Sequence, residues 1–305
     1  MNWFFIALIG PFLYALTNHI DKILLEKYFK KSGVGTLILF SSLLSAIALP
    51  FFFIADSTIL NVDVKSIIIL SIVGILNVLV LWCYLIALQY EEASITVIFY
   101  QLVPVFGYIL GYFILGEVLN KLQLIAMATI ILGMTIVSFE VDSDNRFKLR
   151  KRTVFPMLLA AFFWALGSVL FKLVAIEENL WRSLFWEHLM LVFVGIFIFT
   201  FIRSYRTNFL TAIKVNSKAI ISLNILNELL YILGNIVFAF AYLLAPIGLV
   251  LITESFQPIF VLIIGIFLTI FFPKITVEKI KAKHLWPKII AILITGIGTY
   301  VLFIS

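Results

Sequence analysis

The sequence predicts an all-α polytopic membrane protein, and three features of the chain lead to this expectation. Of its 305 residues, 63% are hydrophobic and only 12% are charged, and the mean hydropathy is +1.17. Soluble domains carry roughly 45–50% apolar and about 25% charged residues. Stretches without Asp, Glu, Lys or Arg recur at the length of about 20 residues that a helix needs to cross a bilayer. The basic residues fall in the short gaps between these stretches.

Ten membrane-crossing helices are expected from these stretches. Seven of them each predict one crossing: residues 1–20, 32–55, 66–90, 93–116, 122–139, 153–171 and 289–305. The stretch 219–273 is too long for one crossing, so we expect a turn at Ala245-Pro246-Ile247-Gly248, because proline and glycine end a helix. Residues 181–203 contain Glu187 and His188 but continue into a clean apolar run, and we expect the seventh crossing there. Residues 1–20 lack a basic start and a cleavage site, so we interpret them as a retained helix.

The distribution of basic residues predicts the orientation of the chain. With ten crossings, 17 Lys and Arg fall in the loops on one side and three in the loops on the other. Basic residues concentrate in short cytoplasmic loops. We therefore expect a multi-pass protein of the cytoplasmic membrane, with both termini outside the cytoplasm.

Several functional classes are not expected from the composition. The net charge of +6 arises from dispersed residues that form no continuous face, so no nucleic-acid partner is expected. The sequence has one cysteine and three histidines, and it lacks HExxH, phosphate-loop and GxSxG motifs. No metal site, cofactor or catalytic residues are therefore expected. The expected partners are the lipid bilayer and a small-molecule substrate, and the chain is expected to be a monomer or a homodimer.

The two halves of the chain resemble each other. At a shift of 150 residues, Phe12-Leu13-Tyr14-Ala15-Leu16 and Lys22 align with Phe162-Phe163-Trp164-Ala165-Leu166 and Lys172. At a shift of 154, the matched pairs are Ala87 with Ala241, Pro104 with Pro258, Phe106 with Phe260 and Gly111 with Gly265. Because five is odd, successive five-helix units enter the membrane from opposite sides. We therefore predict two inverted five-helix repeats, 3–139 and 153–304, joined by a charged cytoplasmic linker, 140–152.

These residues resemble the EamA-type transporters of the drug/metabolite transporter superfamily. The resemblance rests on Trp164-Ala165-Leu166-Gly167-Ser168, on Pro104 and Pro258, and on Leu115-Gly116-Glu117 followed by Leu132-Gly133. It implies a carrier built from five plus five inverted helices. The Gly-Glu pair is not repeated in the second half, where Phe272-Pro273-Lys274 stands instead.

Polar residues within the eighth predicted helix follow a spacing of three or four residues. With Phe238 filling one gap, the polar residues that share one face are Asn224, Glu228, Tyr231, Asn235 and Tyr242. Such a row either joins two packed helices or lines a cavity. We favour the cavity, because the row is more than three turns long.

Polar residues in the first and sixth helices form two matching sets. Tyr14, Asn18 and Lys22 are spaced by four, as are Trp164, Ser168 and Lys172. Each lysine either extends to the membrane interface or belongs to one of two gates at opposite faces.

The fourth and ninth helices each carry polar residues close to a proline. Gln101 precedes Pro104, and Glu254 and Gln257 precede Pro258. These prolines either make structural kinks or help to build a binding site at mid-membrane depth. Glu187 and His188 are expected at the membrane interface.

Together these residues predict a secondary active transporter. It would move a small polar or amphipathic metabolite by alternating access, with export as the expected direction and proton coupling through Glu228 or Glu254. The alternative is a translocase for a lipid-linked carrier on the same scaffold. An intramembrane enzyme is not favoured, because the candidate nucleophiles and bases form no recognisable motif.

Overall fold

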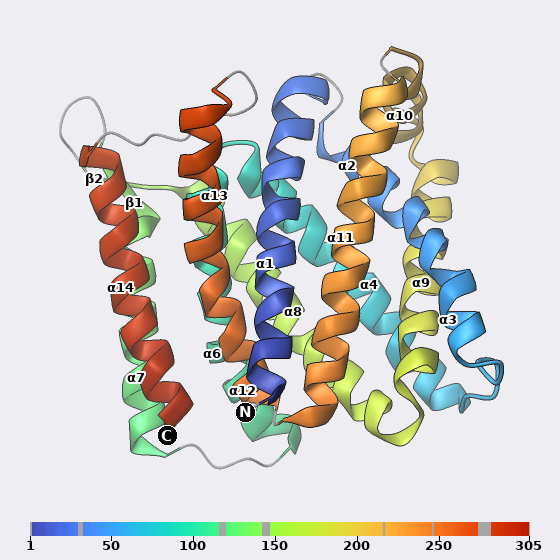
Figure 1. Cartoon of the computed structure of the whole chain (residues 1–305), viewed down its shortest axis with the longest axis horizontal. Coiled ribbons are helices and arrows are strands. Elements are labelled where there is room, and N and C mark those ends of the chain that lie inside the picture. Colours follow the sequence, from blue (N-terminus) through green and yellow to red (C-terminus); the bar gives the residue numbers. More distant parts are fainter. Residues whose placement is uncertain are drawn as a thin grey trace.

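The computed structural model describes residues 2–29, 33–115, 120–141, 147–215, 217–245, 247–273 and 282–304. These residues form a bundle of helices with one short β-hairpin (Figure 1). Glu117, Pro246 and Lys274, which the sequence motifs include, lie outside the described residues.

The N-terminal part of the chain contains five helical segments, three of which are interrupted. The first is α1 (Asn2–Ile23), extended by the π-turn η1 (Leu24–Tyr28). The second comprises α2 (Val34–Leu44), the 3₁₀ turn η2 (Ser45–Ile47) and α3 (Ala48–Ala55), and the third is α4 (Val64–Leu88). The fourth comprises α5 (Ala93–Thr96), the 3₁₀ segment η3 (Val97–Gln101), α6 (Leu102–Leu110) and the π-turn η4 (Gly111–Leu115), and the fifth is α7 (Lys121–Ser138).

A β-hairpin follows within the linker predicted at 140–152. Strands β1 (Phe139–Val141) and β2 (Phe147–Leu149) pair antiparallel, with Phe139 opposite Leu149. The hairpin was not predicted, because two three-residue strands are too short for an alternating pattern to be recognised.

The C-terminal part contains α8 (Lys151–Glu177), α9 (Leu180–Phe201), α10 (Arg203–Val215) and α11 (Ser217–Leu244). It continues with α12 (Ile247–Ile252), the 3₁₀ segment η5 (Thr253–Phe256), α13 (Gln257–Phe271) and α14 (Ala282–Ile304). The short helix α10 was not expected. Because of its basic residues, this segment was predicted to be a loop. In the structure its Phe209 ring packs against that of Phe40 on α2, with ring centroids 4.6 Å apart.

Eight helical segments of the described residues are long and apolar enough to cross a membrane, so the chain is a multi-pass membrane protein. In α7 and α14 the apolar stretches found are shorter, Lys121–Gly133 and Leu285–Val301. The ten-helix count therefore stays a prediction. The expected turn near residue 246 is confirmed, since α11 ends at Leu244 and α12 begins at Ile247.

The outer surface of the bundle carries many exposed phenylalanines, including Phe5, Phe113, Phe155 and Phe201. A soluble monomer does not tolerate apolar surface of this extent, whereas lipid tails solvate it. Because lipid offers no hydrogen bonds, backbone groups must be satisfied within the helical segments, including those that 3₁₀ or π-turns interrupt.

Helices from the two parts of the chain pack against each other throughout the bundle. The most extensive contacts are those of α4 with α8, α7 with α14, and α1 with α11. The two termini lie at one end of the bundle, whereas α10 and the β-hairpin lie at the opposite end (Figure 1). The end with the termini is the terminal end, and the end with α10 and the β-hairpin is the hairpin end.

Candidate functional site

A cavity of about 120 Å³ lies among α1, α2, α4, α8, α9 and α11, with Tyr100 of η3 and Gln257 of α13 also in its wall. A water molecule takes up about 30 Å³ in the liquid, so a ligand of several heavy atoms is the appropriate size. Seven residues predicted from the sequence line this cavity: Tyr14, Asn18, Trp164, Ser168, Tyr231, Asn235 and Gln257. The wall therefore combines polar groups from both parts of the chain.

A chain of hydrogen bonds crosses the cavity wall near Asn18. The Gln257 amide donates to Asn18 Oδ1 at 2.7 Å, and the Asn18 amide donates to the Tyr84 hydroxyl at 2.8 Å. Nearby, the Asn227 amide donates to Asp21 Oδ1 at 2.7 Å. These bonds join α1 to α4, α11 and α13, and Asp21 brings a carboxyl group to the cavity.

Glu187 and His188, which the sequence predicted at the membrane interface, both have side chains buried inside the protein. Glu187 lines the cavity, and its Oε1 accepts hydrogen bonds from the amides of Asn77 at 2.6 Å and Asn235 at 3.0 Å. Its Oε2 has no hydrogen-bond partner among the described residues. His188 lies on the next position of α9, against the ring of Phe52, and its Nδ1 is 2.9 Å from the carbonyl oxygen of Leu184.

Glu228 is buried and is not among the residues that line the cavity. The hydroxyls of Ser41 and Ser45 donate to its two carboxyl oxygens at 2.6 and 2.8 Å. These serines were not predicted as site residues, although their spacing of four places them on one helix face. Asn224, from the same predicted row, donates to the carbonyl of Ile220 at 2.7 Å.

Lys22 and Lys172 make matching contacts at opposite ends of the bundle. Lys22 Nζ donates to the carbonyl oxygens of Leu88 at 2.8 Å and Glu91 at 2.5 Å, just after α4 reaches its C-terminus. Lys172 Nζ donates to the carbonyl of Ala245 at 2.8 Å, just beyond the C-terminus of α11. Helix C-termini leave backbone carbonyls unpaired and attract positive charge. Both lysines therefore act as caps on a neighbouring helix, a contact that the sequence did not reveal.

Glu254 and Gln101 lie in the two 3₁₀ segments, η5 and η3, which contact each other. Both side chains are fully buried, and their polar side-chain atoms have no hydrogen-bond partner among the described residues. Each segment lies within one turn before a proline, Pro104 or Pro258. Since proline has no N–H to donate, the regular hydrogen-bond pattern is interrupted here, as the sequence predicted.

Aromatic rings make up much of the remaining cavity wall. Tyr14 stacks on Tyr231 with ring centroids 5.7 Å apart, and Trp164 meets Tyr14 edge-on at 5.7 Å and Tyr100 edge-on at 4.7 Å. Glycine allows this arrangement at one point, because a Cβ at Gly234 would lie 2.5 Å from the Tyr14 ring.

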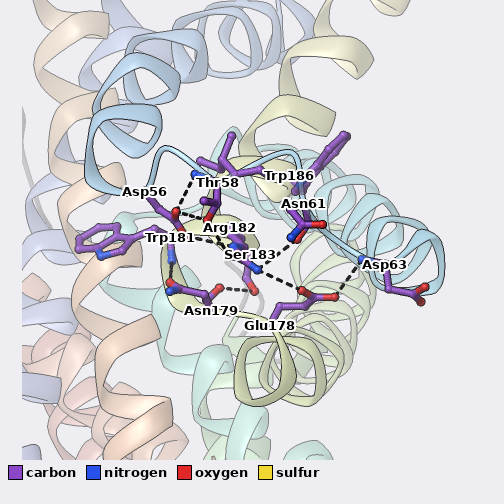
Figure 2. A network of polar contacts seen from close by, with 11 residues as sticks. Asp56, Thr58, Asn61, Asp63, Glu178, Asn179, Trp181, Arg182, Ser183 and Trp186 are labelled. Atoms are coloured by element: carbon purple, nitrogen blue, oxygen red, sulfur yellow. Dashed lines mark hydrogen bonds and ion pairs between the residues drawn. The ribbon is translucent and has the colours of Figure 1, made fainter.

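The terminal end of the bundle is held by a polar network that joins the α3–α4 loop to the start of α9 (Figure 2). Arg182 binds Asp56 Oδ2 at 3.1 Å, the Thr58 hydroxyl at 2.6 Å and the Asn61 carbonyl at 3.1 Å. Glu178 accepts a hydrogen bond from the backbone N–H of Asp63 at 3.0 Å. Hydrogen bonds from the Thr58 hydroxyl and N–H, together with Arg182, lower the pKa of Asp56 below its ordinary value.

The hairpin end is held by a second set of ion pairs. Arg150, which follows β2, binds Glu91 at 2.5 Å, and Lys288 of α14 pairs with Glu92 and donates to the Ser94 hydroxyl at 2.8 Å. The two ends of the bundle thus carry different sets of ion pairs.

No group of three or more His, Cys, Asp or Glu side chains able to hold a metal ion occurs in the described part of the chain.

Comparisons with known proteins concern the fold and one half of the sequence. Residues 1–139 match the model of the EamA-like transporter family. No curated protein matches the chain significantly. A solved structure described as "Crystal structure of protein" aligns with 97% of this chain and 95% of its own, with a TM-score of 0.53 and 13% sequence identity. At this identity the likeness shows a shared fold over nearly the full length.

Proposed function

We propose that the chain is a secondary active carrier that moves a small polar or amphipathic metabolite across the cytoplasmic membrane, a proposal that the match of residues 1–139 to the EamA-like transporter family supports. The observation that carries this proposal is the cavity, whose polar wall is built by helices from both parts of the chain. Ionisable side chains inside a membrane bundle are costly to bury and commonly mark a substrate or ion path. Export is the direction that we propose.

The proposal includes an inverted repeat of five plus five helices, and three observations support it. Lys22 contacts the carbonyl of Glu91 and Lys172 that of Ala245, positions that match at the shifts of 150 and 154 residues found in the sequence. The 3₁₀ segments η3 and η5 also correspond at a shift near 154. Under the same shifts α1 matches α8 and α4 matches α11, so the contact of α1 with α11 has its counterpart in the contact of α8 with α4.

Alternating access requires each end of the cavity to open in turn. We propose that the Arg182 network closes the terminal end and that the Glu91–Arg150 and Glu92–Lys288 pairs close the hairpin end. A change of state that separates the paired side chains would break these contacts and open that end. The loop charges place the hairpin end in the cytoplasm under this proposal.

Proton coupling through Glu254 is the second part of the proposal, with Glu228 as the other candidate. The oxygens of Glu228 each accept a serine hydroxyl hydrogen bond, whereas those of Glu254 have no hydrogen-bond partner within the described part of the chain. Glu254 is therefore able to take up or release a proton without breaking a hydrogen bond. The titratable side chains that interact with its charge are Tyr14, Tyr100 and Tyr242.

The experiment has two stages. First, metabolites are compared between cells with and without the gene, and flux of the compounds that change is measured in vesicles containing the full chain. Second, the flux is measured with and without a pH gradient for wild type, Glu254→Gln and Glu228→Gln, with Glu177→Gln on the exposed end of α8 as the control.

We expect Glu254→Gln to transport at a rate independent of the pH gradient, while Glu177→Gln keeps the wild-type dependence. Coupling that survives in Glu254→Gln and is lost in Glu228→Gln assigns the role to Glu228. Coupling that survives in both removes both residues from the mechanism. Vesicles with the full chain that move none of the changed metabolites contradict the carrier proposal itself.

A further inference from the structure

The charged groups of the cavity wall are all acidic among the residues that the structure describes. Asp21 and Glu187 line the cavity, and no described lysine, arginine or histidine does so. The two intramembrane lysines do not balance these carboxyls, because Lys22 and Lys172 donate to backbone carbonyls at helix ends. An anionic ligand would therefore meet carboxyl groups without a basic partner, which disfavours it.

Glu187 is the acidic group with a free hydrogen-bonding position. Its side chain is 2% exposed, and its Oε1 is held by the amides of Asn77 at 2.6 Å and Asn235 at 3.0 Å. These two bonds come from α4 and α11 and fix the orientation of the carboxyl group. Its Oε2 has no partner among the described residues. A buried acceptor without a donor is costly, and a ligand N–H is able to remove that cost.

The aromatic part of the wall suits the same kind of ligand. Tyr14, Tyr231, Trp164 and Tyr100 pack in one cluster, with neighbouring ring centroids 4.7 to 5.7 Å apart. Aromatic faces attract cations, and Trp does so most strongly. They also cover the apolar part of a small molecule.

We infer that the carried metabolite is a small organic cation with an ammonium N–H group, which binds Glu187 Oε2 while its apolar part contacts the rings of Trp164 and Tyr14. This inference rests on the proposed function, because it names the substrate class of the same cavity. Asp21, whose Oδ1 accepts from Asn227 at 2.7 Å, adds a second carboxyl group to the wall. The cavity volume of about 120 Å³ sets the size to several heavy atoms.

The test compares ligands of one carbon-chain length that differ in charge. Butylammonium, butan-1-ol, butyrate and zwitterionic 4-aminobutyrate are titrated against the purified full chain, and affinities are obtained from ligand-dependent shifts of the thermal unfolding midpoint. We expect wild type to bind butylammonium at least tenfold more tightly than each of the other three. Glu187→Gln should weaken butylammonium binding at least tenfold and leave butan-1-ol binding unchanged, whereas Glu177→Gln should alter neither.

The wild-type comparison decides the inference even where Glu187→Gln does not fold. Absent butylammonium binding, equal affinity for all four probes, or preference for butyrate or 4-aminobutyrate overturns the cation assignment. None of these outcomes affects the carrier proposal, which is tested by flux of the metabolites that change in cells. Conversely, tight butylammonium binding without any flux in vesicles supports the cation site and contradicts the carrier proposal.

Discussion

Replacement of Lys22 by methionine should destabilise the protein, because this lysine of α1 donates hydrogen bonds to backbone carbonyls at the C-terminal end of another helix, α4. Its Nζ donates to the carbonyls of Leu88 at 2.8 Å and Glu91 at 2.5 Å, and lies 3.1 Å from Glu26. Methionine keeps an unbranched apolar side chain of similar size and removes the charge and all three contacts.

The magnitude follows from the two carbonyl contacts. Hydrogen bonds from a charged donor contribute about 1.5–3 kcal/mol each, and the desolvation of the buried ammonium offsets part of their sum. The Glu26 contact adds less than about 1 kcal/mol, because exposed ion pairs are weak. We expect a loss of about 3 kcal/mol, which is a factor of roughly 100 in the unfolding equilibrium. Lys172→Met should also destabilise the protein, since Lys172 Nζ donates to the carbonyl of Ala245.

The assay is unfolding of the detergent-solubilised full chain by denaturant, followed by circular dichroism. Lys27→Met is the matched control, because Lys27 is exposed near the end of the same helical segment. Equal stability of Lys22→Met and Lys27→Met would refute the capping role. Normal stability of Lys22→Met with lost transport would instead favour the gate interpretation of this lysine.

Two further predictions concern the terminal end and the packing of α7 with α14. Asp56→Asn should destabilise the protein at neutral pH, because it removes the charge of the Asp56 carboxylate. The folded-state pKa of Asp56 lies below its ordinary value of 3.8, so the stabilisation by this charge is present above pH 3.8 and disappears as the pH falls below that value. The thermal unfolding midpoints of wild type and variant should therefore converge between about pH 5 and about pH 3. A constant difference over this range would exclude a contribution from the Asp56 charge. Gly298→Ala should destabilise the protein by about 1–3 kcal/mol, since its Cβ would lie 2.8 Å from the backbone oxygen of Ala126. Gly296→Ala should be neutral or stabilising, because a Cβ there would meet no neighbouring element of the described residues within 4 Å. Equal unfolding free energies for the two variants would contradict the close approach of α7 and α14.

The positions of most helices could be predicted from the sequence because lipid imposes a simple rule. A crossing segment must be apolar and about 20 residues long, and its backbone must be satisfied within the helix. The expected stretch 66–90 corresponds to α4 (Val64–Leu88), and the expected 181–203 to α9 (Leu180–Phe201). Helix α10 was missed, since its amphipathic pattern interrupts the apolar runs on which the prediction depends.

Part of the cavity could also be predicted, because helical periodicity determines which residues share a face. Tyr231 and Asn235 were selected by their spacing and line the cavity, as do Tyr14, Asn18 and Trp164. The same reasoning selected Glu228, which instead accepts hydrogen bonds from two serines outside its own helix. Periodicity places a residue on a face, but it does not say whether that face meets a cavity or another helix.

The sequence by itself thus determined the membrane environment, most helix bounds and the faces on which polar residues gather. Only the tertiary structure decided the partners of those residues. Glu187 joins Asn77 and Asn235, which lie 110 and 48 residues away in the chain, and Lys22 reaches carbonyls 66 and 69 residues away. The physical reason is that burial in lipid and helical periodicity are local properties of a segment. The partner of a buried charge, in contrast, depends on how whole helices pack together.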